Sequence, residues 1–529
     1  MRLRPRHCLV ALIAVLSLAG CGVGKPQNLR DQAWGGSGVG ARALQPKQIR
    51  VVPIERNRAS ATLPNFQEGV LLASFMGDGA DGNELRFAAS LGGPVADALQ
   101  RTAATRTWRP PAGRGLAMAR PQARVAFEAW LAQRSRHLLP GARPWRGRAP
   151  ARQPQLDDRQ TFFIWEQVKN DKGEMESQRK PYSARLEEIT ARTYFYVDER
   201  YLEGDIATLA PSLREIGKHF EEVAIPADTK YFGDYPLPPN DVDGDPRLTV
   251  LFTKMPEGVG GYFNPGDAFK EEVSNARDML YMSADALKAG SLSWIKATLI
   301  HELYHMINFN HKWVKPVLQG GVPANERPFL NEGIAVLAEQ LGGFGLPAQE
   351  ESAFFFVHEY LAQNPSAQLT ADNASPEGRY KYGSGYLFNL YLLEQYGPEV
   401  LRKLTQSPKA GIENVEMATG RPFADIFRDW AITLYASGYS ADPRYNYKSI
   451  NLRQKFRWSN GAETQLDGLA PLDVAEFPDI QAIKAQPWSI IPIRFLAPGP
   501  GQSLTISLTG SNWAGLQATV LDAATLREP

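Results

Sequence analysis

His301-Glu302-Leu303-Tyr304-His305 is the stretch of this 529-residue sequence that decides the fold. On a helix, His301 and His305 lie one turn apart on the same face, so both imidazoles can bind a single metal ion. Glu302 then lies beside the metal, where it can take a proton from water and deliver it to a leaving amine. Two histidines and a glutamate at this spacing indicate zinc-assisted hydrolysis of peptide bonds.

The residues on both sides of this stretch predict that it lies on a half-buried helix. Residues 293–300 carry apolar side chains at helical spacing, and Met306 and Ile307 continue the run. The sequence has only seven histidines, and three of them, at positions 301, 305 and 311, fall within eleven positions. This clustering favours a metal site over a helix with solvated or core histidines.

A zinc site with two histidines needs a third protein ligand and an open position for water. One candidate is His311, which follows His301 by ten residues. This is the offset of the third histidine in metzincins, which the stretch resembles except that Asn308 stands where they have glycine. Metzincins also need a methionine turn below the metal, and the only methionine after Met306 is Met417, in a predicted helix.

The other candidate is Glu332, in the predicted helix Phe329–Glu339. An acidic side chain among apolar neighbours is costly to bury unless it is paired or bound to a metal. The stretch resembles the second metal-binding helix of gluzincins, where an Asn-Glu pair supplies a carboxylate ligand. The resemblance implies that Glu332 is the third ligand. The alternative is a first-turn glutamate that complements the helix dipole.

The stretch Tyr380–Phe388 resembles the gluzincin helix whose leading tyrosine hydrogen-bonds the developing oxyanion. Tyr382 matches that tyrosine, and Tyr380 is the second choice. One such donor contributes about 3 kcal/mol to catalysis in other enzymes. The alternative is an aromatic residue that belongs to the core.

These motifs, with Asp241–Asp245 before a predicted strand, resemble the hyicolysin family of bacterial zinc metallopeptidases over roughly residues 190 to 437. The resemblance implies an α+β fold of the zincin type, gluzincin class, and endopeptidase activity. The stretch Gly260–Pro265 also resembles the substrate loop of zinc aminopeptidases. Phe263 replaces the glutamate that binds a free N-terminus in those enzymes, and this departure favours an endopeptidase.

Asp241, Asp243 and Asp245 alternate around Gly244, as in calcium loops with oxygen ligands. Nearby Asn240 offers another oxygen. The later positions of an EF-hand loop do not follow. A calcium ion is therefore one interpretation of this stretch, and a polar turn before the next strand is the other.

The N-terminus is typical of an export signal. Three arginines lie in the first six residues, and the apolar run Leu9–Ala19 is too short for an ordinary membrane span. Leu18-Ala19-Gly20-Cys21 resembles the bacterial lipobox, whose cysteine is diacylated. Because Gly22 stands where an inner-membrane retention signal has aspartate, the resemblance implies the outer membrane of a Gram-negative cell. The alternative is an ordinary signal peptide.

Composition excludes some classes of protein. Cys8 lies in the predicted signal, so a disulfide within the mature chain is not expected. The formal net charge of +1 argues against a nucleic-acid binder. Between Arg101 and Arg152 there are twelve arginines and one acidic residue. This basic stretch could lie against anionic lipid, or it could be a solvated linker or a face of a prodomain-like segment.

Periodicity and turn residues, together with the resemblances to the lipobox and to zincin peptidases, divide the chain into seven segments. They are a lipoprotein signal peptide with its lipobox (1–21), a tether (22–48), a small β-rich region (49–100), an Arg- and Pro-rich linker with one helix (101–160), an upper zincin subdomain with the metal-binding helix (161–328), a helical lower subdomain (329–442) and a β-rich C-terminal region (443–529). In the upper subdomain we predict strands at Thr193–Val197, Arg247–Phe252 and Asp278–Met282. An extended substrate can add to an edge strand of such a sheet.

The sequence therefore predicts a zinc endopeptidase anchored in the bacterial envelope through lipidated Cys21, with protein or peptide substrates. His301, His305 and Glu332 are the expected metal ligands, Glu302 the general base and Tyr382 the oxyanion donor. The alternative is a lipid-anchored surface binding or assembly protein that keeps the zincin fold without turnover. The intact set of base, histidines and acid argues against this alternative.

Overall fold

The computed structural model describes residues 42–43, 49–54, 58–76, 83–92, 105–106, 127, 130–131, 152–169, 175–203, 206–234, 242–256, 258–269, 274–363, 366–372, 375, 380–440, 442–510 and 515–523. The predicted signal with Cys21, most of the tether, most of the basic stretch and Asp241 lie outside the described residues. The described part mixes helices and sheets, as expected for an α+β protein. Within it, no helix combines the length and the apolar character that crossing a membrane requires.

A six-stranded sheet in the order β11-β12-β10-β9-β8-β7 carries the site. Its strands are β7 (Arg159–Lys169), β8 (Met175–Ile189), β9 (Thr193–Asp198), β10 (Leu248–Thr253), β11 (Gly261–Phe263) and β12 (Met279–Ser283). Strands β9, β10 and β12 are parallel and buried throughout, which explains their continuous apolar sequences. These are the three strands predicted from the sequence, and the prediction is confirmed. The short edge strand β11, antiparallel to β12, was not predicted.

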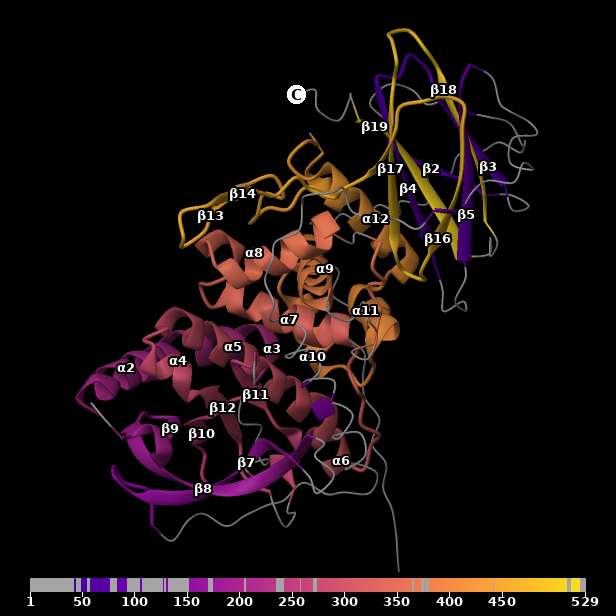
Figure 1. Cartoon of the computed structure of the whole chain (residues 1–529). Coiled ribbons are helices and arrows are strands. Elements are labelled where there is room, and N and C mark those ends of the chain that lie inside the picture. Colours follow the sequence, from indigo (N-terminus) through magenta and orange to yellow (C-terminus); the bar gives the residue numbers. More distant parts are fainter. Residues whose placement is uncertain are drawn as a thin grey trace, which may run out of the picture. The chain divides into compact units, whose positions relative to one another are not determined.

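Helices cover one face of this sheet (Figure 1). They are α2 (Ile206–His219), α3 (Ile225–Phe232), α4 (Ala284–Lys288) and α5 (Leu292–Phe309), and α5 continues through a π-helical turn (Asn310–Val314) into α6 (Lys315–Leu318). Leu280 and Met282 of β12 belong to the same hydrophobic core as Leu299 and Leu303 of α5. On the other face, Tyr281 belongs to a second core. The apolar stripe of α5 therefore fixes the orientation of its histidines relative to the sheet.

Between residues 328 and 436 the described part of the chain is mainly helical, as predicted. The helices are α7 (Pro328–Leu341), α8 (Glu351–His358), α9 (Lys381–Tyr396), α10 (Glu399–Gln406), α11 (Gly411–Thr419) and α12 (Phe423–Ala436). Phe388 of α9 packs edge-on against Phe329 of α7 and Trp430 of α12. This aromatic core holds α7 in place, and α7 carries the predicted third metal ligand.

Strands from the two ends of the sequence form a pair of sheets around one core. The sheets have the orders β1-β3-β18-β5-β16-β6 and β15-β17-β4-β19-β2. Their strands are β1 (Arg42–Ala43), β2 (Ile49–Val52), β3 (Arg58–Leu63), β4 (Glu68–Phe75), β5 (Asn83–Leu91), β6 (Thr105–Arg106), β15 (Leu472–Val474), β16 (Asp479–Ala485), β17 (Ile490–Leu496), β18 (Leu504–Gly510) and β19 (Leu516–Asp522), and a separate hairpin pairs β13 (Lys455–Arg457) with β14 (Glu463–Gln465).

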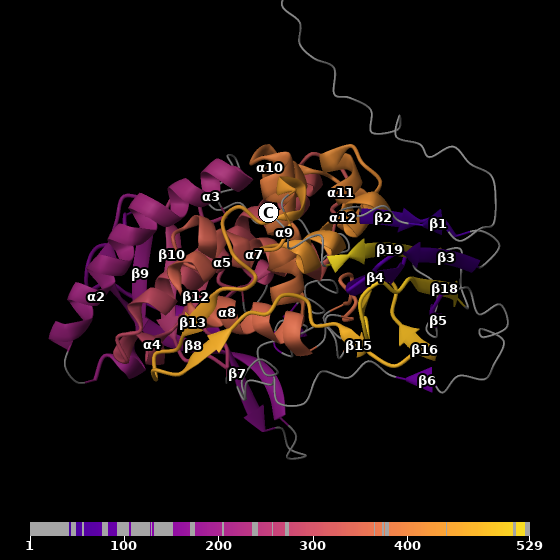
Figure 2. The ribbon, with the colours of Figure 1, turned by 90° about the horizontal axis from the view of Figure 1, so that it is seen from above.

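The two β-rich regions taken as separate in the sequence are thus joined. Strand β4 pairs with both β17 and β19, and β5 pairs with both β16 and β18. Figures 1 and 2 show the indigo and yellow strands side by side. Phe87 of β5 and Phe495 of β17 meet edge-on in the shared core. Alternating sequence shows which side chains are buried but not which distant strand is the partner, so this joining was not visible beforehand.

Candidate metal centre

Helix α5 presents both histidines of the central motif to α7. His301 is almost completely buried, and the two imidazole centroids lie 4.9 Å apart. The neighbouring residues Ile300 and Leu303 are buried in the core, which leaves the histidine face of α5 directed at α7. The predicted pairing of the two side chains on one helix face is present.

Glu332 of α7 completes a group of three possible metal ligands. Its Oε2 lies 3.7 Å from His301 Nε2 and 3.4 Å from His305 Nε2, and the three ligand atoms are all within 4.8 Å of one another. Zinc bonds of about 2.0–2.1 Å at tetrahedral angles place ligand atoms about 3.4 Å apart. Oε2 is also buried and has no hydrogen-bond partner in the described part of the chain. The donor set and its spacing fit a zinc ion.

The outer nitrogen of each histidine is held by a side chain of α7. His301 Nδ1 lies 2.7 Å from Glu339 Oε1, and His305 Nδ1 lies 3.3 Å from Asn331 Oδ1. When Nδ1 carries the proton in these bonds, Nε2 keeps its lone pair on the side of Glu332. Glu339 and Asn331 therefore orient the rings as metal ligands require.

Asn331 also positions the carboxylate ligand. Its Nδ2 donates to Glu332 Oε1 at 3.1 Å, and its Oδ1 accepts a hydrogen bond from Asn308 Nδ2 at 2.9 Å. Oε1 is thereby occupied, and Oε2 is left for the metal. The Asn-Glu pair noted in the sequence thus acts as one unit, in which the amide orients the carboxylate.

A buried cation lies near this carboxylate. Burial alone raises the pKa of Glu332, but the positive charge of Lys381, followed by the interactions with His305 and His301, outweighs burial and holds this pKa well below its usual range. Lys381 is the first residue of α9 and is only 2% exposed. Sequence reasoning missed Lys381 because its position next to Tyr382 did not distinguish it from a surface lysine.

Glycines explain how α9 comes so close to α7. A Cβ at Gly333 would lie 2.6 Å from the carbonyl oxygen of Gly385, and a Cβ at Gly385 would lie 2.7 Å from that of Phe329. The side-chain amide of Asn389 donates to the same Phe329 oxygen at 2.8 Å. The glycines of the two motifs thus permit a helix crossing directly beside Glu332.

Glu302 lies against the edge strand and is not part of the ligand group. The backbone N–H of Phe263 in β11 donates to Glu302 Oε2 at 3.0 Å, and Glu302 is buried. The proposed base is therefore fixed at the strand edge on the helix that also carries both histidines.

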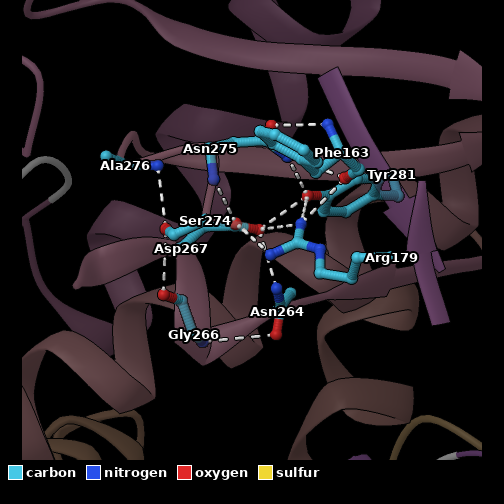
Figure 3. A network of polar contacts seen from close by, with 9 residues as sticks. All are labelled: Phe163, Arg179, Asn264, Gly266, Asp267, Ser274, Asn275, Ala276 and Tyr281. Atoms are coloured by element: carbon cyan, nitrogen blue, oxygen red, sulfur yellow. Dashed lines mark hydrogen bonds and ion pairs between the residues drawn. The ribbon is translucent and has the colours of Figure 1, made fainter. Parts of the chain in front are cut away.

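A buried polar network fixes the chain directly after β11 (Figure 3). Arg179 of β8 pairs with Asp267 at 2.9 Å, and both side chains are almost completely buried. Asp267 also accepts hydrogen bonds from Tyr281 of β12 at 2.6 Å and from Asn264 at 2.9 Å. Asn275 donates to the Tyr281 hydroxyl at 2.6 Å. Because these contacts tie residues after β11 to two strands of the sheet, they hold the Phe263 N–H in place.

Tyr382 lies in the core. Its ring is 1% exposed and stacks on Phe356 with a centroid distance of 4.8 Å, and Lys381 Nζ is 4.9 Å from the ring centroid. Tyr380 is also buried. The oxyanion role of Tyr382 stays a prediction, and its packing favours the alternative of a core aromatic residue.

His311 lies apart from the ligand group, in the π-helical turn after α5. Its Nε2 faces the backbone of Gly233, where an added Cβ would lie 2.7 Å away. Burial, reinforced by the charge of Lys315, lowers the pKa of His311 to about 4. The structure therefore brings Glu332, and not His311, to the two histidines.

The aspartates of the possible calcium loop bind protein donors. Asp245 accepts hydrogen bonds from the Tyr194 hydroxyl at 2.9 Å and the Arg247 N–H at 3.1 Å, while Asp243 lies 3.6 Å from Arg277. In the described part of the chain, these two aspartates are not gathered into a metal-binding group. Their contacts are those of a polar turn.

The chain is similar to the neutral metalloprotease ShpI of Staphylococcus hyicus, with 26% identity over 250 residues. The match covers 45% of this chain and 53% of the relative, so the chain spans about half the length of the protein it matches. A comparison with known protein families finds no match. The distant similarity supports a metallopeptidase, in agreement with the group of His301, His305 and Glu332.

Proposed function

We propose that this protein is a zinc-dependent endopeptidase of the hyicolysin and gluzincin type. The observation that carries the proposal is that the His301 and His305 Nε2 atoms converge on Glu332 Oε2, at 3.7 and 3.4 Å respectively. The proposal is supported by Glu302 on the same helix and by the similarity to a neutral metalloprotease.

His301, His305 and Glu332 would hold the zinc ion, which when bound supplies Lewis-acid chemistry and lowers the pKa of water to about 7. Glu302 accepts the proton of the attacking water and passes it to the leaving amine. The Phe263 N–H holds the Glu302 carboxylate at the strand edge. The charge of Lys381 lowers the pKa of Glu332 and so favours the ionised carboxylate that a metal ligand requires.

The edge strand provides a place for the substrate. In an antiparallel edge strand, alternate residues direct their N–H and C=O groups outward, and an extended peptide can pair with the groups that Glu302 does not occupy. Phe263 stands at the position where aminopeptidases have an acidic side chain that binds a free N-terminus. We therefore infer that the substrate extends past the site in both directions, as an endopeptidase requires.

Glu302→Gln tests the mechanism. The amide has the shape of the carboxylate but cannot accept a proton, so kcat should fall about 100- to 10,000-fold while zinc content stays at the wild-type level. The matched control is Glu413→Gln, an exposed position on α11, which should retain full activity. Unchanged cleavage of casein by Glu302→Gln would refute the mechanism. Wild-type protein that binds zinc and cleaves no peptide of a broad library would instead favour a surface binding or assembly protein.

We also propose that the protein is a lipoprotein of the bacterial envelope, anchored at Cys21. The support is the sequence Leu18-Ala19-Gly20-Cys21 after a basic and apolar leader. A diacylglycerol with a further acyl chain anchors stably, whereas one chain binds reversibly. Cys21→Ser should therefore release active enzyme into the soluble fraction. A variant that stays with membranes in high salt would refute the anchor.

A further inference from the structure

Trp294, in the first turn of α5, lies against the start of the edge strand. A Cβ added to Gly260 would be 2.5 Å from the indole Cη2, so the ring covers the glycine backbone. Trp294 as a whole residue is nevertheless 38% exposed. Two turns further along the same helix, Glu302 contacts Phe263. One face of α5 therefore follows the strand from Gly260 to the proposed base.

A third contact lies between these two. A Cβ at Gly261 would be 3.0 Å from Thr298 Cγ2. The Thr298 hydroxyl donates to the Trp294 carbonyl at 2.9 Å, which fixes this turn of the helix. Because Gly260 and Gly261 have no side chains, Trp294 and Thr298 lie directly against the strand backbone.

The distance from the indole to Glu302 is similar whether it is estimated along α5 or along the edge strand. Eight residues of α5 separate Trp294 from Glu302, and they span about 12 Å at 1.5 Å per residue. Three residues of strand separate Gly260 from Phe263, and they span about 10 Å at 3.3 Å per residue. An extended substrate covers this distance with three to four residues.

The pairing of β11 gives the direction of a bound peptide. The Ser283 N–H donates to the Gly260 carbonyl at 2.9 Å, so Gly260 faces β12. By alternation, Gly261 and Phe263 direct their backbone groups to the free edge, and the Phe263 N–H does contact Glu302 there. Antiparallel pairing is the more stable mode. A peptide paired in this way runs from Phe263 toward Gly260 in its own N-to-C direction.

We propose that Trp294 forms a subsite for an aromatic or large aliphatic side chain of the substrate, three to four residues to the C-terminal side of the scissile bond. This inference rests on the proposed endopeptidase function. An apolar side chain that stacks on the exposed indole removes apolar surface of both groups from water. The subsite makes substrate length and sequence on the C-terminal side determinants of kcat/KM.

A peptide series with one common cleavable bond tests this subsite. Peptides extend two or five residues beyond that bond, and the longer ones carry Phe or Gly at the third and fourth positions. The wild type should cleave the long Phe peptide with a kcat/KM about tenfold above that of the long Gly peptide. Trp294→Ala should abolish this preference, and Trp294→Phe should retain part of it. Met417→Ala, which removes an exposed apolar side chain on α11, should leave the preference unchanged.

The short peptides show whether a change is local, because they end before Trp294. Wild type and Trp294→Ala should cleave them at equal rates. The subsite is overturned if the Trp294→Ala enzyme keeps the Phe preference. It is also overturned if kcat/KM falls equally for short and long peptides. A wild type that cleaves the short peptides but does not prefer Phe over Gly in the long peptides also overturns it. A wild type that cleaves no peptide overturns the proposed function itself, and the subsite with it.

Discussion

Glu339→Gln should weaken zinc binding although it changes none of the proposed metal ligands. In the structure, Glu339 Oε1 lies 2.7 Å from His301 Nδ1, and both side chains are buried. Glutamine keeps an acceptor oxygen in nearly the same shape but removes the negative charge. The charge-assisted hydrogen bond becomes a neutral one, which is about half as strong.

The expected loss follows from the role of such partners. Carboxylates that orient a metal-binding histidine typically contribute 10- to 100-fold to metal affinity. This corresponds to about 1.4–2.7 kcal/mol. The acceptor at His305 Nδ1 is the neutral Oδ1 of Asn331 at 3.3 Å, so His305 cannot compensate for the loss at His301. Glu339→Ala, which removes the acceptor, should lose at least as much affinity as Glu339→Gln.

The assay is competition for zinc with a chromophoric chelator at fixed pH, with the folded state of each variant checked by circular dichroism. Glu413→Gln again serves as the control, because its exposed side chain lies on α11. Zinc affinities of Glu339→Gln and Glu339→Ala within twofold of the wild type would refute the idea that Glu339 orients His301. Loss of affinity in the control as well would point to a nonspecific effect.

Three further predictions concern the third ligand, the buried histidine and the helix crossing. Glu332→Ala should lose zinc while His311→Ala retains it, as measured by metal analysis after dialysis, and the reverse result would favour the metzincin arrangement. Because the pKa of His311 is lowered from 6.5 to about 4, its stabilising effect is complete above pH 6.5 and is lost as the pH falls toward 4. Because the unfolded chain takes up this proton first, the free energy of unfolding should fall by about 2 kcal/mol between pH 7 and pH 5. His311→Gln should show a smaller shift in Tm over this interval, and a shift equal to that of the wild type would contradict the assignment. Gly333→Ala should destabilise the fold by about 1–3 kcal/mol and weaken zinc binding, whereas Gly499→Ala, with no atom within 4 Å of its added Cβ and no positive φ, should leave zinc affinity unchanged.

Local sequence predicted the elements that carry the chemistry. The apolar spacing around His301 and His305 predicted α5, and the structure has that helix over Leu292–Phe309. The resemblance to the second metal-binding helix of gluzincins, together with the cost of burying an acid among apolar residues, suggested Glu332 as a ligand, and the structure places its carboxylate beside both imidazoles. The position of α5 depends on residues within a few helical turns, which periodicity resolves.

Contacts between distant parts of the sequence were not predictable in the same way. Strand β11 has three residues, Gly261 to Phe263, too few for an alternating pattern. Glu339 lies two turns after Glu332 on the same helix face, so a search for partners of the outer histidine nitrogens would have found it. For Lys381 no such signal exists, because only the crossing of α9 over α7 brings its charge near Glu332.

That crossing connects packing to chemistry. The Gly385 carbonyl oxygen would lie 2.6 Å from a Cβ at Gly333, whereas ordinary contacts begin at 3.4 Å. A methyl group there would push the helices apart by about 1 Å, several times the tolerance of about 0.2 Å that metal–ligand distances allow. Glu332 is the residue next to Gly333, and α7 is held between α5 and α9. The glycine is therefore as much a condition of the proposed metal binding as the carboxylate it follows, although it offers no ligand atom.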